Sequence, residues 1–506
     1  MDLARPFTSR VSRRSVVKAG AMGLFAAELA VLGKLVTKPD RMALAATSLP
    51  DIQFDIGNFI APAQNFNGIP FRFGPVFTGF ATLRLNRAPT KTDQSNLATA
   101  LNDIEAVFPF SPSGAFTFIS YGVPYFNRLP GGINGALVQQ FMPHITSGRN
   151  PDGTTNALAE AVPSPTDVSS ANPGITKQTF NVAVAIERND MLLTVRSDSQ
   201  NNLNNILNWL FFNSNNLGGN AIASPPGFST LFTVTSARLM FQQNGLPKQV
   251  ATQNNLPYTA RIRDTSPMWM SMADQQVDGS GPAAITTFAG NASAHLTDKV
   301  AGNYFDNGSI QHLSHVIQDL AQFYATPAQD PPAGETYQER VQYMFRSNDT
   351  STADGLPNDG FADQFTNGGG PAFLDNRFQG PGDAARNAQG IGTFQGAKRM
   401  GHESALQRSS RAADGTPIHI RMDGPGFNNM DVPGGSNQPK LQFTVFVPTA
   451  EFFRVMRVNQ ASLDLVNQFG VADDDNGLER FITATRRQNF LVPPRRHRAF
   501  PLLEMT

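Results

Sequence analysis

Two strand–helix–strand patterns, one in each half of the chain, constrain the fold most. In the first half, runs that alternate apolar and polar residues are separated by stretches with apolar residues at helical spacing. The strand-like runs are 77–86, 115–121, 179–187 and 230–241, with 192–196 as a run that extends or pairs with 179–187, and the helical stretches are 93–108 and 199–212. This order with an antiparallel return is typical of a ferredoxin-like sandwich. We therefore predict an α+β fold with an antiparallel sheet.

The second half has the same kind of alternation between strand-like and helical runs, although its sequence shows no clear similarity to the first half. Its strand-like and helical runs are 308–324, 441–447, 449–469 and 481–490. A chain of 506 residues is too long for one ordinary core. We predict an N-terminal ferredoxin-like domain over 76–265 and a C-terminal one over 266–506, which together form a dimeric α+β barrel-like unit. Residues 346–397, rich in Gly, Asn and Asp, are predicted to be a loop insertion.

Two details of the predicted helices can be tested directly. The helix at 93–108 has Thr92 or Asp93 as its candidate cap. The helix at 449–469 is expected to break near Gln460.

The N-terminus has the pattern of a twin-arginine export signal. Residues 12–18 read Ser-Arg-Arg-Ser-Val-Val-Lys, and a weakly apolar run and the small-x-small site Ala-Leu-Ala at 43–45 follow. Glu28 and Lys34 interrupt the apolar run, which disfavours a permanent membrane span. We predict a signal peptide over 1–45, an extended segment over 46–75, and a periplasmic, cell-wall or extracellular location. The alternative is a chance pair of arginines before an apolar helix.

Charge and cysteine content exclude several classes of function. The 40 basic and 40 acidic side chains cancel, so nothing indicates a nucleic-acid or anionic-membrane partner. The absence of cysteine excludes disulfides, thiolate-ligated haem, iron–sulfur clusters and Cys-zinc sites. Any metal must therefore be held by His, carboxylate or Tyr. No nucleophile elbow, P-loop or dinucleotide-binding glycine motif supports a common hydrolase, kinase or dehydrogenase.

Seven histidines are the main candidates for metal ligands. His312 and His315 could bind a metal together on a helix, whereas in a strand they would point to opposite faces. Residues 473–477 read Asp-Asp-Asp-Asn-Gly but lack the later glutamate of a calcium loop, so they predict a connecting turn. The three histidines of polar loops, which we expect to be solvated, are His144, His295 and His497.

The strongest candidate is the stretch that begins at His402. An Asp-Gly turn at 414–415 and a short strand at 418–421 lead from His402 to Arg421, which is 421 − 402 = 19 positions away. Upstream, Asp274 follows an apolar run. Taken alone, His402 is either a metal ligand or a hydrogen-bonded or exposed histidine. Arg421 could equally be a salt-bridged arginine and Asp274 a loop cap.

Together these residues resemble the dye-decolourising peroxidases. Members of that family have two ferredoxin-like halves and bind haem in the C-terminal one. They carry a Gly-x-x-Asp-Gly motif, a strand–helix unit, a proximal histidine and then an arginine at a similar spacing. The resemblance covers roughly 76–500, and it includes 115–130 and the closing run 441–494. It implies haem b, with His402 as the axial iron ligand, Arg421 on the opposite face and Asp274 as the distal acid.

The motif around the acid departs from the family pattern. Residues 271–275 read Ser-Met-Ala-Asp-Gln, so both glycines are missing and the turn that aims the carboxylate is altered. Asp278, followed by Gly279, is a competing position for the acid. The spacing from Asp274 to His402, 402 − 274 = 128, is longer than is usual in the family because of the predicted insertion. Asp274 and Asp278 therefore remain alternatives.

The resemblance implies an exported haem peroxidase that uses hydrogen peroxide to oxidise small organic substrates. A carboxylate can move a proton between the two peroxide oxygens, and a guanidinium can stabilise the charge that develops on one of them. Two alternatives are a haem-binding protein of the same fold with little turnover and an exported binding or structural protein without haem. Trp269 and Tyr324 are the first candidates for electron transfer, or else core residues. No nucleic-acid partner and no stable membrane span after processing are expected, and a homo-oligomer is left open.

Overall fold

The computed structural model of this protein describes most of the chain between residues 48 and 506. The described residues are 28, 32, 35, 48–66, 69–146, 153–167, 175, 177, 179–271, 282–290, 296–326, 328, 336–337, 339–340, 344, 391–394, 397–407 and 418–506. Asp274, Asp278, His295, nearly all of the predicted signal peptide and most of the predicted insertion lie outside them. In this part of the chain, no helix combines the length and the apolar character needed to cross a membrane.

The first half forms a four-stranded antiparallel sheet. Its strands lie in the order β4–β6–β3–β7. With the chain order strand–helix–strand, strand–helix–strand, this is the ferredoxin-like topology. The elements are β3 (Phe77–Leu85), α2 (Lys91–Val107), β4 (Phe116–Tyr121), β6 (Met191–Ser197), α5 (Gln200–Phe211) and β7 (Phe232–Phe241).

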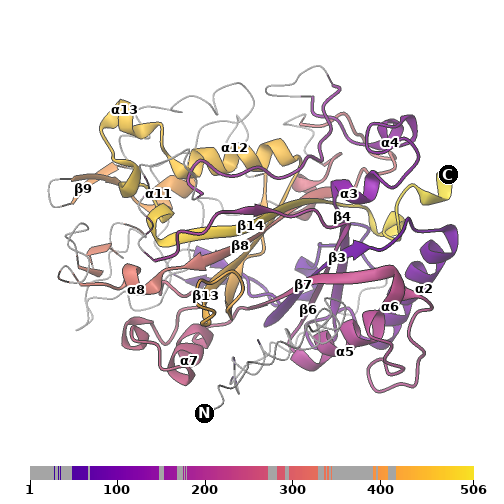
Figure 1. Ribbon diagram of the computed structural model, residues 1–506, viewed down its shortest axis with the longest axis horizontal. Coiled ribbons are helices and arrows are strands. Elements are labelled where there is room, and N and C mark those ends of the chain that lie inside the picture. Colours follow the sequence, from indigo (N-terminus) through magenta and orange to yellow (C-terminus); the bar gives the residue numbers. More distant parts are fainter. Residues whose placement is uncertain are drawn as a thin grey trace, which may run out of the picture.

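The second half repeats the same strand order. Its strands lie as β11–β13–β8–β14, again with antiparallel neighbours. The elements are β8 (Ser309–Gln318), α8 (Leu320–Phe323), β11 (Ile420–Arg421), β13 (Gln438–Val447), α12 (Ala450–Ala461) and β14 (Ile482–Val492). Figure 1 shows α12 lying across this sheet. The predicted α+β fold of two ferredoxin-like halves is confirmed.

The two sheets join edge to edge at β4 and β14. One ladder pair, Leu491 with Tyr121, connects these strands. The side-chain amide of Gln53 completes the junction, since its Nε2 donates to the carbonyl oxygens of Ile119 (3.0 Å) and Pro493 (2.7 Å). A side chain thus supplies hydrogen bonds where the backbone ladder is short.

The opposite edges meet at a second seam, between β7 and β12 (Gly424–Asn428), which pairs with β13. A Cβ added at Gly426 would lie 2.9 Å from the carbonyl oxygen of Leu239 on β7. The Glu28 carboxylate accepts from the Leu239 N–H (2.8 Å) and from Asn428 Nδ2 (2.7 Å). Burial raises the pKa of Glu28 to about 8. Leu32 is buried in the main core.

Apolar and aromatic side chains fill the inner faces of both sheets. The segment predicted to be extended, 46–75, contributes to this filling, and the Phe54 ring stacks on Phe446 with centroids 4.0 Å apart. The segment also contains η1 (Gly57–Phe59) and the hairpin of β1 (Gln64–Phe66) and β2 (Ile69–Phe71). The inner cluster is Phe54, Ile56, Phe59, Ile60, Phe80, Phe116, Phe118, Leu192, Met240, Leu313, Met422, Phe446, Phe490 and Val492.

The structure corrects two expectations about single elements and confirms a third, the helix break near Gln460. Of the predicted strand at 179–187, two residues form β5 (Ala185–Ile186), which runs parallel to β14. The place beside β4 belongs instead to β6, which is buried at every position. The helix after β13 ends at Ala461, because Ser462 adopts φ 57°, and α13 (Leu465–Phe469) follows, close to the predicted break. The end of the predicted insertion forms a hairpin of β9 (Ile391–Phe394) and β10 (Ala397–Met400).

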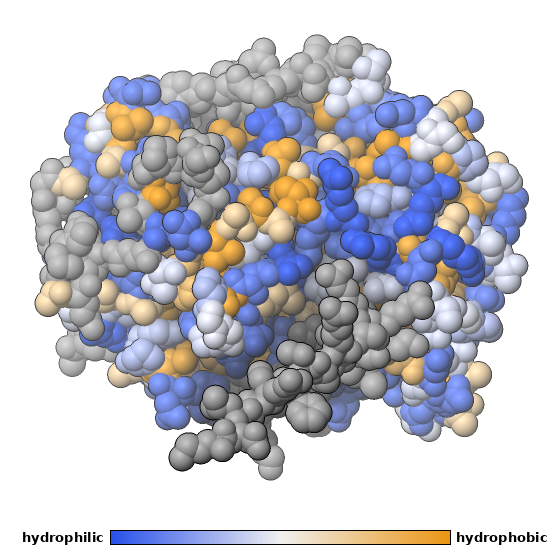
Figure 2. Space-filling model, viewed as in Figure 1, coloured by the Kyte–Doolittle hydropathy of each residue, from blue (hydrophilic) through white to orange (hydrophobic). Residues whose placement is uncertain are grey.

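Short elements connect these strands and helices. They are α3 (Val123–Phe126), α4 (Ala136–Phe141), α6 (Phe228–Leu231), α7 (Leu246–Gln253), η2 (Thr259–Arg261), η3 (Ala283–Thr286), α11 (His402–Gln407), η5 (Asp473–Asp475), η6 (Glu479–Phe481), η7 (Arg495–His497) and η8 (Leu503–Met505). On the face drawn in Figure 2, apolar side chains gather near the centre, over the region of α12 and β14, with hydrophilic side chains around them.

Candidate functional site

A cleft, which we call the His402 cleft, lies between the outer face of the second sheet and α12. Strands β8, β13 and β14 form its floor, and α11, α12 and η6 border it. Its lining residues are Thr166, Asp167, Met268, Met270, Ser314, Val316, Gln318, His402, Arg421, Asp423, Leu441, Phe443, Arg457, Gln460, Leu478, Glu479, Ile482, Ala484 and Arg487.

His402 reaches the cleft from the first turn of α11. This short helix directly follows β10, and its residue Ala405 is buried in a small cluster with Met400 and Leu465. Gly477 passes close by, since a Cβ added there would lie 3.9 Å from Cα of His402. Packing on both sides of α11 therefore positions a half-buried imidazole at the cleft.

Arg421 reaches the same cleft from β11. It pairs with Val445 of β13. Alternate residues of a strand share a face, so Arg421 lies on the side of the sheet that carries Phe443 and Leu441. The structure thus brings His402 and Arg421, two of the three predicted site residues, to one cleft.

The third predicted residue is not described, and neither is its alternative Asp278. Met268 and Met270, which are among the last described residues before Asp274, line the cleft. The described chain therefore stops next to the cleft. A different carboxylate, Asp423, also lines the cleft. The sequence interpretation missed Asp423, although in an extended chain it would share a side with Arg421.

Two buried ion pairs border the cleft. Arg457 Nη2 lies 3.0 Å from Oε2 of Glu479, and Arg487 Nη2 lies 2.7 Å from Oδ1 of Asp167. Burial opposes the ionisation of Glu479, but the charge and hydrogen bonds of Arg457 outweigh it and lower the pKa to about 2. Arg487 and Asp167 are 320 positions apart, so no local pattern indicates their contact.

His312 and His315 are both in β8 and point to opposite faces, as the strand interpretation predicted. His312 Nδ1 lies 2.7 Å from Oδ1 of Asn489, and Nε2 lies 2.6 Å from Oγ of Ser314. Burial lowers the pKa of His312 well below its usual value, so the imidazole is neutral. His315 faces the barrel interior, with Nδ1 3.0 Å from Oε1 of Gln442. Among the described residues, no three imidazoles or carboxylates come together as a metal site.

Two histidines expected to be solvated have protein partners instead. His144 Nδ1 lies 3.2 Å from Oδ2 of Asp298, and its Nε2 lies 3.1 Å from Oε1 of Gln139. The ring of His497 stacks on Tyr304 with centroids 3.7 Å apart. Asp298 and Tyr304 lie 154 and 497 − 304 = 193 positions from their histidines, so the sequence around each histidine does not indicate these two contacts.

Trp269 and Tyr324 are core residues next to the cleft wall. Trp269 Nε1 donates to the carbonyl oxygen of Gly426 (3.1 Å), and the Tyr324 hydroxyl donates to the carbonyl oxygen of Trp269 (3.0 Å). Both are buried, and both fix the chain around Met268 and Met270.

The chemistry of the His402 cleft fits a haem. A neutral imidazole is a suitable axial ligand, and Val316 and Leu441 offer an apolar surface to a macrocycle. The free space within the cleft is about 90 Å³, and the space between atoms including the open mouth is about 910 Å³. A porphyrin exceeds the smaller volume, so lining side chains would have to move to admit one, and Met268 and Met270 are unbranched and adaptable.

Fold and cleft define an α+β protein of two ferredoxin-like sheets, with an imidazole and a guanidinium over the outer face of the second sheet. The chain belongs to a family of unknown function, DUF7405, whose family model matches residues 158–494. That match covers about two thirds of the chain. No protein of curated function matches the sequence.

Several solved structures are similar to this chain at low sequence identity. A protein from Shewanella oneidensis assigned as a DyP-type peroxidase is 12% identical, with a TM-score of 0.45 over 86% of this chain and 96% of that one. The encapsulated DyP-type peroxidase of Mycobacterium smegmatis also has 12% identity and a TM-score of 0.45, over 86% and 97%. DyPB from Rhodococcus jostii has 12% identity and a TM-score of 0.43, over 84% and 94%.

Proposed function

We propose that this protein binds haem b in the His402 cleft and is a peroxidase of the dye-decolourising type, which oxidises small organic substrates with hydrogen peroxide. The observation that carries the proposal is that His402 and Arg421, 19 positions apart in the sequence, line one cleft over an apolar sheet face. The resemblance in sequence assigns these same residues to opposite faces of a haem.

Each side chain has a separate task. His402 is the residue that would hold the iron, through one nitrogen of a neutral imidazole. When bound, haem supplies the iron at which peroxide is reduced. Arg421 remains charged at every relevant pH and stabilises negative charge on a peroxide oxygen.

A carboxylate completes the set by moving a proton from one peroxide oxygen to the other. The candidates are Asp274 and Asp278, which the sequence indicates, and Asp423, which lines the cleft. Replacing each with Asn in turn and measuring kcat/KM for peroxide identifies the acid, because only that variant loses the proton transfer.

Haem titration into the full chain tests the binding step. We expect a Soret band for the wild type and for His144→Ala, whose imidazole lies outside the cleft and contacts Asp298. His402→Ala should weaken haem binding at least tenfold, because it removes the axial ligand. Absence of a Soret band in the wild type would overturn the proposal and favour a binding or structural protein.

Steady-state kinetics test the catalytic step. Arg421→Leu should retain the Soret band but lower kcat/KM for peroxide by about 10²–10³-fold, the loss typical of a removed charge-stabilising group. If the Soret band is present and Arg421→Leu leaves a slow activity unchanged, the protein binds haem without acting as a peroxidase.

We also propose export by the twin-arginine route, on the basis of the arginine pair at 13–14 and the cleavage site at 43–45. Cleavage there would remove Glu28 from the seam between β7 and β12 and Leu32 from the main core. N-terminal sequencing of protein recovered from outside the cytoplasm tests this, and an intact N-terminus would contradict it.

A further inference from the structure

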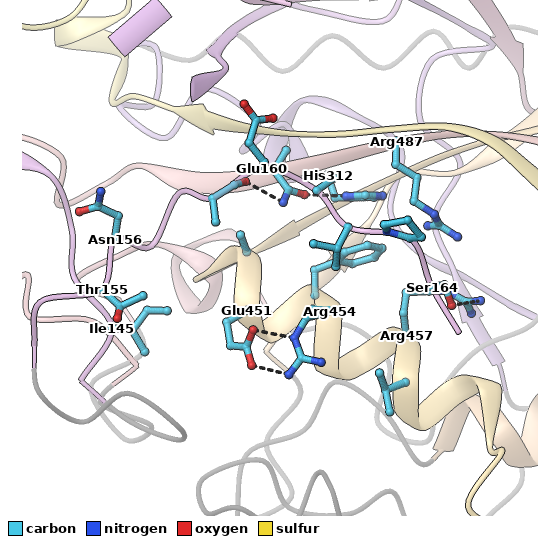
Figure 3. A pocket seen from close by; sticks show the side chains of 18 of the residues that line it. Ile145, Thr155, Asn156, Glu160, Ser164, His312, Glu451, Arg454, Arg457 and Arg487 are labelled. Carbon is cyan, nitrogen blue, oxygen red and sulfur yellow. Dashed lines mark hydrogen bonds and ion pairs between the residues drawn. The ribbon is translucent and has the colours of Figure 1, made fainter. Parts of the chain in front are cut away.

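A second cleft, which we call the α12 cleft, lies along α12 beside the His402 cleft. It is lined by Ile145, Val162, Phe453, Arg454 and Asn489, among others, and its free volume is about 230 Å³ (Figure 3). Arg457 and Arg487 line both clefts. The α12 cleft is therefore separated from the His402 cleft by a layer of arginine side chains.

The two sides of this arginine layer differ in charge. Asp167 and Glu479, the acids paired with Arg487 and Arg457, line the His402 cleft but not the α12 cleft. The α12 cleft thus faces the cationic side of both ion pairs, and its own lining holds three arginines (Arg454, Arg457 and Arg487) and two glutamates, Glu160 and Glu451. This bias favours an anionic ligand in the α12 cleft.

Arg454 adds a directional contact. Its Nε and Nη2 bind the Glu451 carboxylate at 2.7 and 2.6 Å (Figure 3). Within the described residues, its Nη1 has no hydrogen-bond acceptor, and its side chain is 29% exposed. A guanidinium with donors available at a partly dry site suits a carboxylate.

A flat uncharged surface lies nearby. The His312 ring stacks on Phe453 with centroids 3.6 Å apart and an interplanar angle of 20°. His312 is neutral, and both of its ring nitrogens have partners. At the rim, Val162 is 50% exposed and adds an apolar side chain to the mouth of the cleft. An aromatic ring matches these surfaces.

We propose that the α12 cleft binds a small aromatic carboxylate, with its ring near Phe453 and its carboxylate at Arg454. A volume of about 230 Å³ is below the range of about 300–1,000 Å³ typical of drug-sized ligands, so the ligand is small. A phenolic carboxylate bound there lies beside the His402 cleft and would serve as reductant, a role that rests on the proposed function. Two phenols would each lose one electron and one proton, and hydrogen peroxide would gain two of each to give two waters.

Calorimetry on the full chain without added haem tests the binding. We expect 4-hydroxybenzoate to bind at one site and the neutral isostere 4-hydroxybenzamide to bind at least about tenfold more weakly, because a charge-assisted contact is lost. Arg454→Gln should weaken 4-hydroxybenzoate about tenfold and remove this preference, and Val162→Trp should block the cleft to both. The matched control is Arg87→Gln, since Arg87 makes a similar two-pronged contact with Asp93 far from the cleft.

Equal affinity for the two compounds, or wild-type binding by Arg454→Gln or Val162→Trp, would overturn the proposed site. The reductant role has its own readout in the haem-loaded protein, where Arg454→Gln should raise KM for 4-hydroxybenzoate and leave KM for peroxide unchanged. Because the calorimetry needs no haem, failure of the proposed function and failure of this site give different results.

Discussion

The buried ion pair of Arg457 and Glu479 shows how strongly single residues fix the clefts. The two residues are 8% and 3% exposed, and Arg457 also donates to Gln460, Ser164 and Thr166. A buried charge without its partner is costly, so each residue holds the other in place. This pair therefore holds the Arg457 side chain between the two clefts.

The pair predicts a specific dependence of stability on pH. The pKa of Glu479 falls from 4.5 to about 2 on folding, so its contribution is fully present above pH 4.5 and is lost as pH falls through 2. The shift corresponds to about 3 kcal/mol of unfolding free energy. Glu479→Gln should remove this part of the acid dependence and cost about 3–5 kcal/mol at pH 7. Urea unfolding at pH 7 and pH 3 measures both effects.

Glu451→Gln is the matched control, since Glu451 pairs with Arg454 in a partly exposed contact. This substitution should lower the free energy of unfolding by about 1 kcal/mol or less. Equal losses for the two variants would show that burial does not set the strength of the Arg457 pair.

At the level of elements, α2 illustrates how the chain defines a helix start. The Thr90 hydroxyl accepts from the Asp93 N–H at 3.2 Å, and the Asp93 carboxylate accepts from the Thr90 N–H at 2.7 Å. This capping box places the cap at Thr90, two residues before Thr92 and three before Asp93, the two predicted caps. Asp93 acts from the first turn, and Arg87 holds its carboxylate as well.

Removing this cap should destabilise the fold measurably. Thr90→Ala leaves one N–H of the first turn without its acceptor and should lower the free energy of unfolding by about 1 kcal/mol. The exposed neighbour gives a control with the same chemical change, so Thr92→Ala should have a smaller effect. Thermal melts of both variants test the assignment, and an equal loss for the two would place the cap elsewhere.

At the scale of the whole molecule, the protein depends on two seams that its sheets do not close by regular ladders alone. Gln53 bridges the seam between β4 and β14, and in the uncleaved chain Glu28 bridges the one between β7 and β12. Both residues come from the N-terminal part of the chain. Polar side chains there satisfy strand edges that would otherwise be open to other chains.

Close approach at the second seam predicts a difference between two glycines of β12. Gly426→Ala would place Cβ 2.9 Å from a backbone oxygen of Leu239, which cannot move cheaply, and should cost about 1–3 kcal/mol. Gly424→Ala would meet the Met240 side chain at 3.0 Å, and an adaptable methionine can shift, so the loss should be smaller. Chemical unfolding of the two variants compares them, and a larger loss for Gly424→Ala would contradict this geometry of the seam.

The sequence by itself determined the features that depend on neighbours along the chain. Alternation marked β3, β4 and β13, helical spacing marked α2 and α5, and the rarity of histidine singled out His402. These patterns are readable because a strand or a helix puts its apolar residues at a fixed spacing. The spacing of His402 and Arg421 was equally visible, and the structure brings both to one cleft.

Tertiary structure alone decided which strands pair, how the seams close and where charges meet. The run at 179–187 looked like a strand, yet β6 occupies the place beside β4, because sheet positions are assigned by competition among distant segments. Arg487 with Asp167 and Gln53 with Pro493 join residues hundreds of positions apart. No local sequence pattern predicts such contacts. Whether a side chain is buried, and therefore how strongly its charge interacts, is decided only when the sheets have assembled.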